Sequence, residues 1–395
     1  MTLDLARVVR QVDTMVGSLD PERQVERFDA LRAAWKDLDD GEINRRFSTA
    51  RTSFLLARRE SHYRQTHALP TIPASYSVVA TDGSMIVPNR HSPARFYMIN
   101  VGTVHLRYGS DPGATMVSEP DLRCSNDDLI VESNGRRIPV SDAIVGLRRA
   151  ALELSTAART ACAQPEASLA LIDGSLILWT LMGQDDTTAQ AVLDEYLQAL
   201  WTLRERRIPV ASYISAPGAA DFMNTLRVSI CDYPLHGRQI NCDDCRMRLV
   251  RDARTPACDI LPNVTDGYLM SQIAGLLPGE RTGAFASDSK ILDRYGPELS
   301  VRFMYLNVGS EIARLEVPAW VADDDDALKL VHAVVYDQCQ LGRGYPVALQ
   351  EAHEMAVIGM ADRQLVDELI ERRMAAAGVT FTRTGKDGSK RDRFV

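Results

Sequence analysis

Residues 1 to about 66 mix apolar and charged positions at the spacing of amphipathic helices. Two stretches carry the pattern, Leu5, Val8 and Val9 in the first and Phe28, Leu31 and Trp35 in the second. Asp20-Pro21 is typical of a helix cap followed by a first-turn proline, and Asp40-Gly41 of a break between helices. The pattern predicts two or three helices that either cap a core or form an arm for docking a partner.

From Ser75 the pattern changes to short apolar runs that are typical of strands. The run SYSVVATDGS predicts one strand, and ARFYMINVGTVHLRYG predicts one or two strands with a turn at Gly102. Residues 141–163 return to helical spacing, and Ser141 is placed to cap that helix. The following segment, SLALIDGSLILW, predicts a buried strand.

Further segments complete a regular succession of elements. Residues 186–206 predict an amphipathic helix, and IPVASYIS at 208–215 predicts a buried strand. The order strand, hairpin, helix, strand, helix, strand predicts an α/β domain with a mixed sheet, and it is also the order of the RNase H-like fold. The second half adds a hairpin turning at Gly309 and helices near 327–341 and 346–359.

Changes in pattern and composition predict the domain boundaries. A segment rich in cysteines, prolines and charges interrupts the α/β pattern, and a polar, basic tail ends the sequence. The predicted parts are an N-terminal helical region (1–70), the first part of the core (71–228), a cysteine-containing insertion (229–262), the second part of the core (263–380) and the tail (381–395).

The composition is that of an ordinary globular protein, with 45% hydrophobic and 25% charged residues. No apolar run approaches the roughly 20 residues that span a bilayer, and the first residues lack the apolar core of a signal peptide. We therefore expect a cytoplasmic protein without a membrane partner. The net charge of −8 argues against a protein that only coats nucleic acid, because such binding depends on Lys and Arg. It does not exclude an enzyme that gathers carboxylates at a metal site.

Two aspartates follow apolar runs in the same triplet, Asp-Gly-Ser. Asp82 and Asp173 are each predicted at the C-terminal end of a strand, where glycine leaves room for a phosphate or a metal-bound water. Asp-Gly is also the strongest two-residue hairpin signal, so a plain turn is the alternative at each position. Repetition of the triplet after two separate strands favours a functional site.

Glu153 supplies a third candidate carboxylate, on the helix that leads into the second of these strands. The small residues Ala150 and Ala157 flank it on the helix surface, and a surface ion pair with Arg149 is the alternative interpretation. A two-metal phosphodiesterase requires convergent carboxylates, because hard oxygen ligands hold the divalent ions. The three carboxylates are therefore candidates for such a site.

The stretch GRGYPVALQEAHEMAVIG at 342–359, together with the two Asp-Gly-Ser triplets, resembles the NurA nuclease domain. The resemblance implies an RNase H-like fold, with acids near the first triplet, on a helix and near the second, plus a C-terminal Tyr and His. The last two correspond to Tyr345 and His353. Pro346 suits the first turn of a helix, so Tyr345 is expected directly before the N-terminus of that helix. His353 is a candidate metal ligand, phosphate-positioning group or proton donor, with a structural histidine as the alternative.

Further segments resemble the same family, so the resemblance covers most of residues 75–395. They are GERTGAFASDSKILDRYG at 279–296, LNVGSEIARLEVPAW at 306–320 and the closing GSKRDRFV. Lys290 is a candidate phosphate contact, with an ordinary surface lysine as the alternative. Glu132 and Glu166 are the alternatives to Glu153 as the helix acid.

The resemblance implies a manganese- or magnesium-dependent exonuclease that degrades DNA from 5′ ends, with endonuclease action on single strands. It also implies a homodimer that works with a HerA-like hexameric ATPase in DNA end resection, repair or defence. The sequence has no G-x-x-x-x-G-K-[ST] loop, so the chain is not expected to be the motor itself. The alternatives are a catalytically inactive dimeric adaptor of such a motor, and a metal phosphohydrolase acting on nucleotides or RNA.

Four of the seven cysteines are spaced C-x10-C-x2-C-x12-C and are Cys231, Cys242, Cys245 and Cys258, with His236 in the first gap. The C-x2-C part is a good half-site for tetrahedral zinc. Structural zinc, an iron–sulfur cluster and unligated thiols are the three interpretations. Thiolates are too soft for catalytic magnesium or manganese, so we expect this cluster to be separate from the active site.

Overall fold

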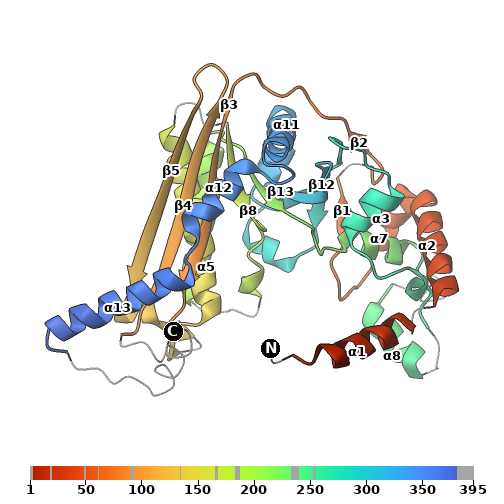
Figure 1. Cartoon of the computed structure of the whole chain (residues 1–395). Coiled ribbons are helices and arrows are strands. Elements are labelled where there is room, and N and C mark those ends of the chain that lie inside the picture. The colour runs from red at the N-terminus through yellow and green to blue at the C-terminus, as the bar shows by residue number, and fades with distance from the viewer. Residues whose placement is uncertain are drawn as a thin grey trace. The chain divides into compact units, whose positions relative to one another are not determined.

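The computed structural model describes residues 3–17, 20–48, 50–60, 62–89, 94–133, 135–164, 168–182, 187–232, 240–251 and 255–379. The chain divides into two compact units. The helical unit is formed by residues 1–64 with 218–275, and the sheet unit by residues 65–217 with 276–395 (Figure 1). The predicted basic tail, Glu166 and His236 lie outside the described residues.

The sheet unit is built on one mixed sheet. Its main path runs in the order β11-β12-β13-β9-β8-β3-β4-β5, and β10 pairs with both β12 and β2. The pairs β3–β8 and β8–β9 are parallel, whereas the other pairs on this path are antiparallel. The strands are β2 (Thr66–His67), β3 (Tyr76–Ile86), β4 (Tyr97–Tyr108), β5 (Gly113–Arg123), β8 (Leu169–Asp173), β9 (Val210–Ile214), β10 (Arg281–Thr282), β11 (Phe285–Ser287), β12 (Val301–Asn307) and β13 (Ile312–Pro318).

The strand order β5-β4-β3-β8-β9 confirms the predicted α/β class. Three antiparallel strands are followed by a helix, a parallel strand, a second helix and a further parallel strand, which is the RNase H-like arrangement. The first helix, α5 (Asp142–Ala163), begins as predicted, with the Ser141 side chain accepting a hydrogen bond from the Ile144 N–H. The predicted β12–β13 hairpin is also confirmed, and Gly309 in its turn has a φ of +95°.

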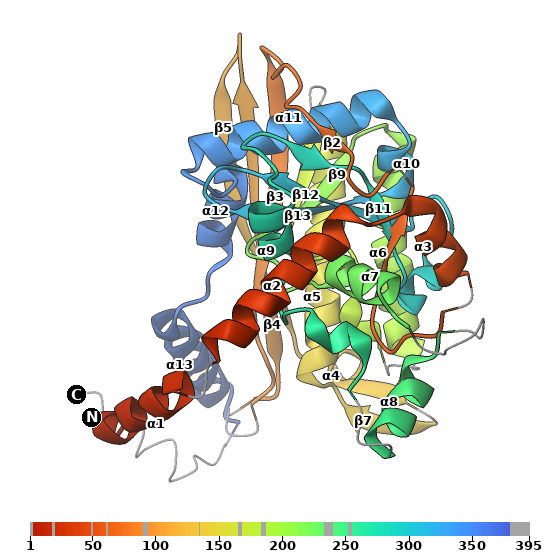
Figure 2. The same cartoon turned by 90° about the vertical axis from the view of Figure 1, so that its right-hand side faces the viewer.

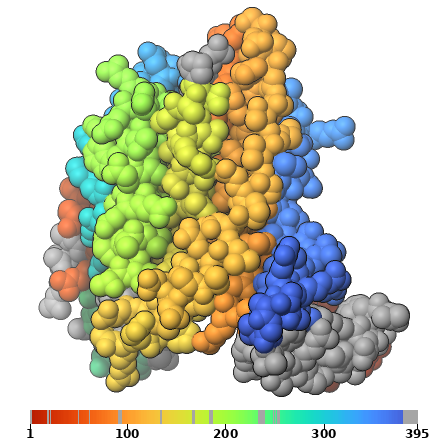
Figure 3. Space-filling view, turned by 90° about the vertical axis from the view of Figure 1, so that its left-hand side faces the viewer, coloured from red at the N-terminus to blue at the C-terminus, as the bar shows by residue number. Residues whose placement is uncertain are grey.

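Strand β3 is buried on both faces, because its successive side chains enter two separate cores. Val79 packs with α5 and α6, whereas Val78 and Ala80 pack with α11 and α12. Burial on both faces explains the nearly continuous apolar run in the sequence. Figure 3 shows α6 beside α5 on one of these faces. The other elements of this unit are α4 (Asn126–Leu129), β6 (Ile130–Ser133), β7 (Arg136–Pro139), η1 (Trp179–Leu181), α6 (Thr187–Glu205), η4 (Lys290–Arg294), α10 (Ala319–Ala322), α11 (Asp325–Leu341), α12 (Val347–Ala356) and α13 (Met360–Ala376).

The prediction of a turn at Gly102 is wrong, because β4 continues through it to Tyr108. A Cβ atom at Gly102 would lie 2.2 Å from the backbone oxygen of Ala352 in α12. Glycine at this position therefore allows α12 to pack directly on the strand. The amide of Asn100 donates hydrogen bonds to the Met355 and Ala356 carbonyls and so holds the C-terminal end of the same helix.

The helical unit joins the N-terminal helices to residues 218–275. Phe222 of α7 packs against the rings of Trp35 and Tyr63, with centroid distances of 5.7 Å and 5.4 Å. Figure 2 shows α2 running beside α7. Among the helices of the described ranges, none combines the length and apolar character needed to cross a membrane. The elements of this unit are α1 (Leu5–Gly17), α2 (Pro21–Lys36), α3 (Asp40–Phe47), β1 (Ala57–Arg59), α7 (Asp221–Ser229), α8 (Cys242–Arg251), η2 (Ala257–Ile260), α9 (Asp266–Tyr268) and a π-helix, η3 (Leu269–Ile273).

Two sequence signals were predicted at the N-terminal helices, a cap at Asp20 and a break at Asp40-Gly41, and only the first is confirmed. Asp20 caps α2, and its side chain accepts a hydrogen bond from the Arg23 N–H, as predicted. The predicted break at Asp40-Gly41 is wrong by a few residues, because both residues lie in the first turn of α3. Asp39 caps that helix, so the acidic residues there serve as cap and first turn rather than as a break.

We expect Gly102→Ala to destabilise the sheet unit, because the added methyl group forces α12 away from the strand. Overpacking of this kind lowers the free energy of unfolding by about 1–3 kcal/mol. The control is Gly146→Ala on α5, where a Cβ meets nothing within 4 Å, and this change should stabilise the helix by about 0.5–1 kcal/mol. Urea unfolding measures both variants. Equal stability of Gly102→Ala and the wild type would contradict the close approach.

Candidate active site

Asp82 and Asp173 lie on neighbouring parallel strands. The β3–β8 pairing ends with Thr81 opposite Ile172, so the two aspartates occupy the next position on each strand. Asp173 is the last residue of β8, as predicted. The prediction that Asp82 also ends its strand is wrong, because β4 continues to pair with β3 as far as Ile86. The site forms where β8 stops and β3 continues.

Gly83 allows the third carboxylate to reach this place. A Cβ atom at Gly83 would lie 2.3 Å from Oε1 of Glu153 and 3.0 Å from Cγ of Arg149. The Thr81 hydroxyl donates a hydrogen bond to the Glu153 carbonyl and so ties α5 to β3 at this point. The space left by the glycine is therefore filled by a side chain of the protein, rather than left for a phosphate or water as predicted.

Glu153 is buried, with 6% of its surface exposed, although its predicted alternative role was a surface ion pair. Arg149 does lie beside it, with Nε 3.2 Å from Oε1, and also donates a hydrogen bond to the Gly83 carbonyl. Glu153 Oε1 accepts no hydrogen bond from any residue that the structure describes. Burial raises the pKa of Glu153 to about 8; Arg149 opposes the shift, and Asp82 and Asp173 add to it.

Tyr345 and His353 contact the two aspartates, one each. The Tyr345 hydroxyl donates a hydrogen bond of 2.9 Å to Asp173, and Nδ1 of His353 lies 2.7 Å from an oxygen of Asp82. Both residues come from the predicted helical stretch, with Tyr345 just before α12 and His353 within it. Burial, followed by the Asp173 carboxylate, raises the pKa of Tyr345, which keeps its hydroxyl protonated as a donor. The structure thus brings all five predicted catalytic residues together.

The electrostatics of the site favour a cation. Burial raises the pKa of Asp173, the Tyr345 hydrogen bond lowers it and the nearby Asp82 raises it. Repulsion between the carboxylates, and a buried Glu153 oxygen that accepts no hydrogen bond from a described residue, fit a divalent ion with oxygen ligands. In the described part of the chain, however, no group of three or more His, Cys, Asp or Glu side chains is arranged as a metal site. Arg149 is the cation that lies next to Glu153.

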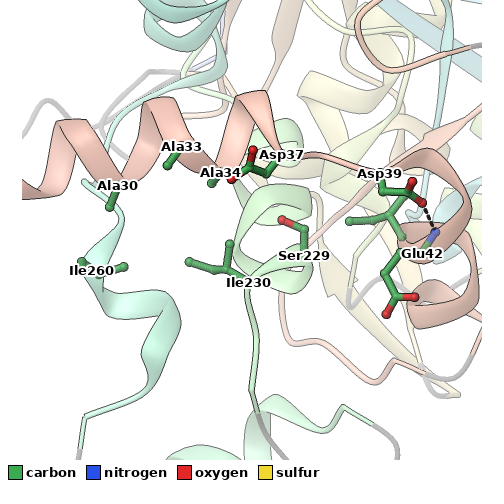
Figure 4. Close-up of a pocket in the computed structure, with 10 residues that line it drawn as sticks. Ala30, Ala33, Ala34, Asp37, Asp39, Glu42, Ser229, Ile230 and Ile260 are labelled. Atoms are coloured by element: carbon green, nitrogen blue, oxygen red, sulfur yellow. Dashed lines mark hydrogen bonds between the residues drawn. The ribbon is translucent and has the colours of Figure 1, made fainter.

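Several predicted candidates lie apart from this cluster. Lys290 is exposed at the start of η4. Glu132 is exposed on β6. A pocket in the helical unit, where Ala33 of α2 lies across from Ile230, contains none of the predicted site residues (Figure 4). The contacts of Asn100 and Gly102 with α12 were missed from the sequence, because Gly102 was interpreted as a turn. A glycine inside a strand pattern was the available signal for such a close approach.

The four predicted cysteines of the insertion all belong to the helical unit. Burial raises the pKa of Cys242 to about 11, and Cys231, Cys258 and Cys245 each raise it further. Among the described residues, which include all four cysteines, no group of three or more His, Cys, Asp or Glu side chains is placed to hold a metal ion. The backbone N–H of Cys242 donates a hydrogen bond to the Arg51 carbonyl, which anchors the start of α8. The zinc assignment stays a prediction.

Comparisons with known proteins identify the family whose domain this chain contains. The family model of the NurA domain matches residues 76–358, a span that contains the five clustered residues. A comparison with curated proteins gives no match. Among solved structures, LC9-RNase H1, a type 1 RNase H with the type 2 active-site motif, matches at 14% identity, covering 48% of this chain and 78% of its own, with a TM-score of 0.22. The strand order β5-β4-β3-β8-β9 identifies the RNase H-like fold.

The raised pKa of Glu153 predicts a pH-dependent stability. The folded protein holds this proton up to about pH 8, whereas the ordinary pKa is 4.5, so the stability it contributes is lost as the pH rises between these values. Between pH 4.5 and about pH 8, the free energy of unfolding should fall by up to a few kcal/mol more in the metal-free wild type than in Glu153→Gln. The control is Glu132→Gln, at an exposed position. Urea unfolding at several pH values measures the difference, and identical pH profiles for wild type and Glu153→Gln would refute it.

We expect one zinc per chain in protein purified without added metal, because Cys242 and Cys245 form a C-x2-C half-site with a further cysteine on each side. Cys245→Ser should lose the zinc, and Cys162→Ser in the sheet unit should retain it. Elemental analysis by mass spectrometry measures both. Finding neither zinc nor iron would assign the four cysteines to ordinary packing.

Proposed function

Because the chain belongs to the NurA domain family of nucleases, we propose that it is a divalent-metal-dependent deoxyribonuclease. More specifically, we propose that the protein is a 5′ to 3′ exonuclease on single- and double-stranded DNA that also acts as an endonuclease on single strands. The observation that carries it is the convergence of Asp82, Glu153 and Asp173, with Tyr345 and His353 in contact with the two aspartates. A catalytically inactive adaptor has no need of a buried glutamate beside two further acids.

The three carboxylates are the groups proposed to hold Mn²⁺ or Mg²⁺, with His353 as a possible further ligand. The bound ions would polarise the scissile phosphate and supply a water of lowered pKa as the nucleophile. The buried Glu153 oxygen, which accepts no hydrogen bond within the described ranges, supports this assignment. Holding an ion requires Glu153 to exchange the adjacent Arg149 for the metal.

The remaining groups act through hydrogen bonds that the structure contains. Asp82 engages Nδ1 of His353, which orients the ring and leaves Nε2 as the group that holds or gives a proton to the leaving oxygen. The His353 side chain is 63% exposed, so DNA can reach it. Tyr345 donates a hydrogen bond to Asp173 and packs edge-on against Tyr213, which fixes the orientation of the carboxylate.

The proposed partners are DNA, a second copy of the chain and a HerA-like hexameric ATPase, in the cytoplasm. The net charge of −8 and the missing nucleotide-binding loop support a motor that supplies both DNA retention and movement. Degradation of long duplexes should therefore accelerate when the motor and ATP are added. Equal rates with and without them would refute this dependence, and sedimentation measures the oligomeric state.

The first test uses Asp82→Asn and Asp173→Asn, which remove a charge at nearly constant volume. We expect each to abolish cleavage of end-labelled single- and double-stranded DNA, while the stability stays equal or rises because repulsion between the acids falls. Wild-type protein should cleave with manganese or magnesium and not with EDTA. Activity of both variants near the wild-type level would exclude the metal assignment, and an inactive wild type would favour the adaptor.

His353→Ala separates proton transfer from metal binding. Loss of acid–base help lowers a rate by about 10² to 10⁴, whereas loss of a ligand raises the manganese concentration that half-maximal activity requires. A rate defect that high manganese restores would identify a ligand; a defect at unchanged manganese dependence would identify proton transfer or phosphate positioning. We expect the melting temperature to change little, since α12 packs through Leu349 and Ala352. Normal cleavage by the variant would make the histidine structural.

A further inference from the structure

Strand β13 carries a buried carboxylate that the proposed catalytic steps do not use. Glu316 is 1% exposed and belongs to the segment LNVGSEIARLEVPAW. Its backbone lies between β12 and β9, opposite Phe303 and Ser212. A carboxylate in such a position costs stability unless hydrogen bonds and an opposite charge compensate for the lost water. The partners of Glu316 therefore indicate its role.

Both oxygens of Glu316 are engaged, one by a turn and one by an arginine. Oε2 accepts hydrogen bonds from the Ser175 hydroxyl at 2.7 Å and from the Leu176 backbone N–H at 2.9 Å. Oε1 accepts from Nε of Arg314 at 2.9 Å, and the Arg314 guanidinium lies over the Phe303 ring, 3.8 Å from its centroid. The pair ties β13 to the residues that directly follow Asp173.

The direction of the Asp173 carboxylate depends on this turn, because Asp173 is the last residue of β8. Gly174 has a φ of +80°, in the left-handed region that favours glycine, and its N–H donates to the Tyr213 carbonyl. Ser175 is then held by Glu316. A shift of the turn would rotate Asp173 away from Tyr345 and from the other acids.

We propose that Glu316 is a positioning residue that fixes the Asp173 carboxylate through Ser175 and Leu176, with Arg314 as its counter-charge. This inference rests on the proposed function, because it concerns the same acidic site. Groups that hydrogen-bond around a metal ligand typically change metal affinity or activity by about 10-fold to 100-fold when they are removed. Stability alone is a weak reason for the pair, since apolar replacements of buried ion pairs are often neutral.

Two double variants separate the hydrogen bonds to the turn from the ion pair. R314M/E316L removes both charges and the acceptor oxygen, whereas R314M/E316Q removes the charges and keeps an oxygen that can accept from Ser175 and Leu176. The matched control is Asp266→Asn in the helical unit, because Asp266 is also buried and accepts two backbone hydrogen bonds. Manganese affinity by calorimetry, kcat and KM on end-labelled single-stranded DNA, and the melting temperature are measured for each.

We expect R314M/E316L to bind manganese about 10-fold to 100-fold more weakly and to lose kcat with little change in KM. R314M/E316Q should recover most of the manganese affinity and of kcat at a similar melting temperature. Asp266→Asn should keep the wild-type manganese affinity and kcat per folded molecule. If the wild type binds manganese and cleaves DNA while the two double variants are indistinguishable, or R314M/E316L matches the wild type, this inference alone is overturned. A wild type that neither binds manganese nor cleaves DNA overturns the proposed function and, with it, this inference.

Discussion

Two close approaches to the β3–β4 ladder set the geometry of the candidate site, and each requires a residue without a Cβ atom. At Gly83 the carboxylate of Glu153 occupies the space that a side chain would fill, and at Gly102 the backbone of α12 occupies it. The two glycines lie one register position apart on adjacent strands and face opposite sides of the sheet. Helices from both sides therefore reach the same short stretch of β3, and Glu153 and His353 converge beyond the end of β8.

This convergence brings three carboxyl groups close together, of which Glu153 is buried and Asp173 is exposed. The single arginine beside Glu153 offsets the burial only in part, because the pKa of Glu153 still rises to about 8. Tyr345 and His353 each supply one hydrogen bond to an aspartate, which orients the carboxylates without removing their charge. The two apolar cores on either side of the sheet stabilise the fold against this repulsion, as is typical of sites where function and stability conflict.

Elements with local sequence signals were predicted correctly. Positions whose conformation depends on contacts with distant segments of the chain were not. The cap at Ser141 and the hairpin at Gly309 need only nearby residues, so both were predictable. The interpretation of Gly102 as a turn failed because α12, far along the chain, occupies the space at that strand position. The five clustered residues were predicted as candidates from the triplets and the family resemblance. Their contacts with one another, and the burial of Glu153, depend on packing that no helical wheel contains.

Because the helical unit is discontinuous, the ribosome completes its first segment, residues 1–64, well before its second segment, residues 218–275. Trp35 and Tyr63 complete their aromatic core only with Phe222, which the ribosome reaches after the first part of the sheet unit. At about 5–20 residues per second, the intervening stretch of roughly 150 residues takes roughly 8–30 s to synthesise. The N-terminal helices spend that interval with exposed apolar faces, as substrates for chaperones and proteases.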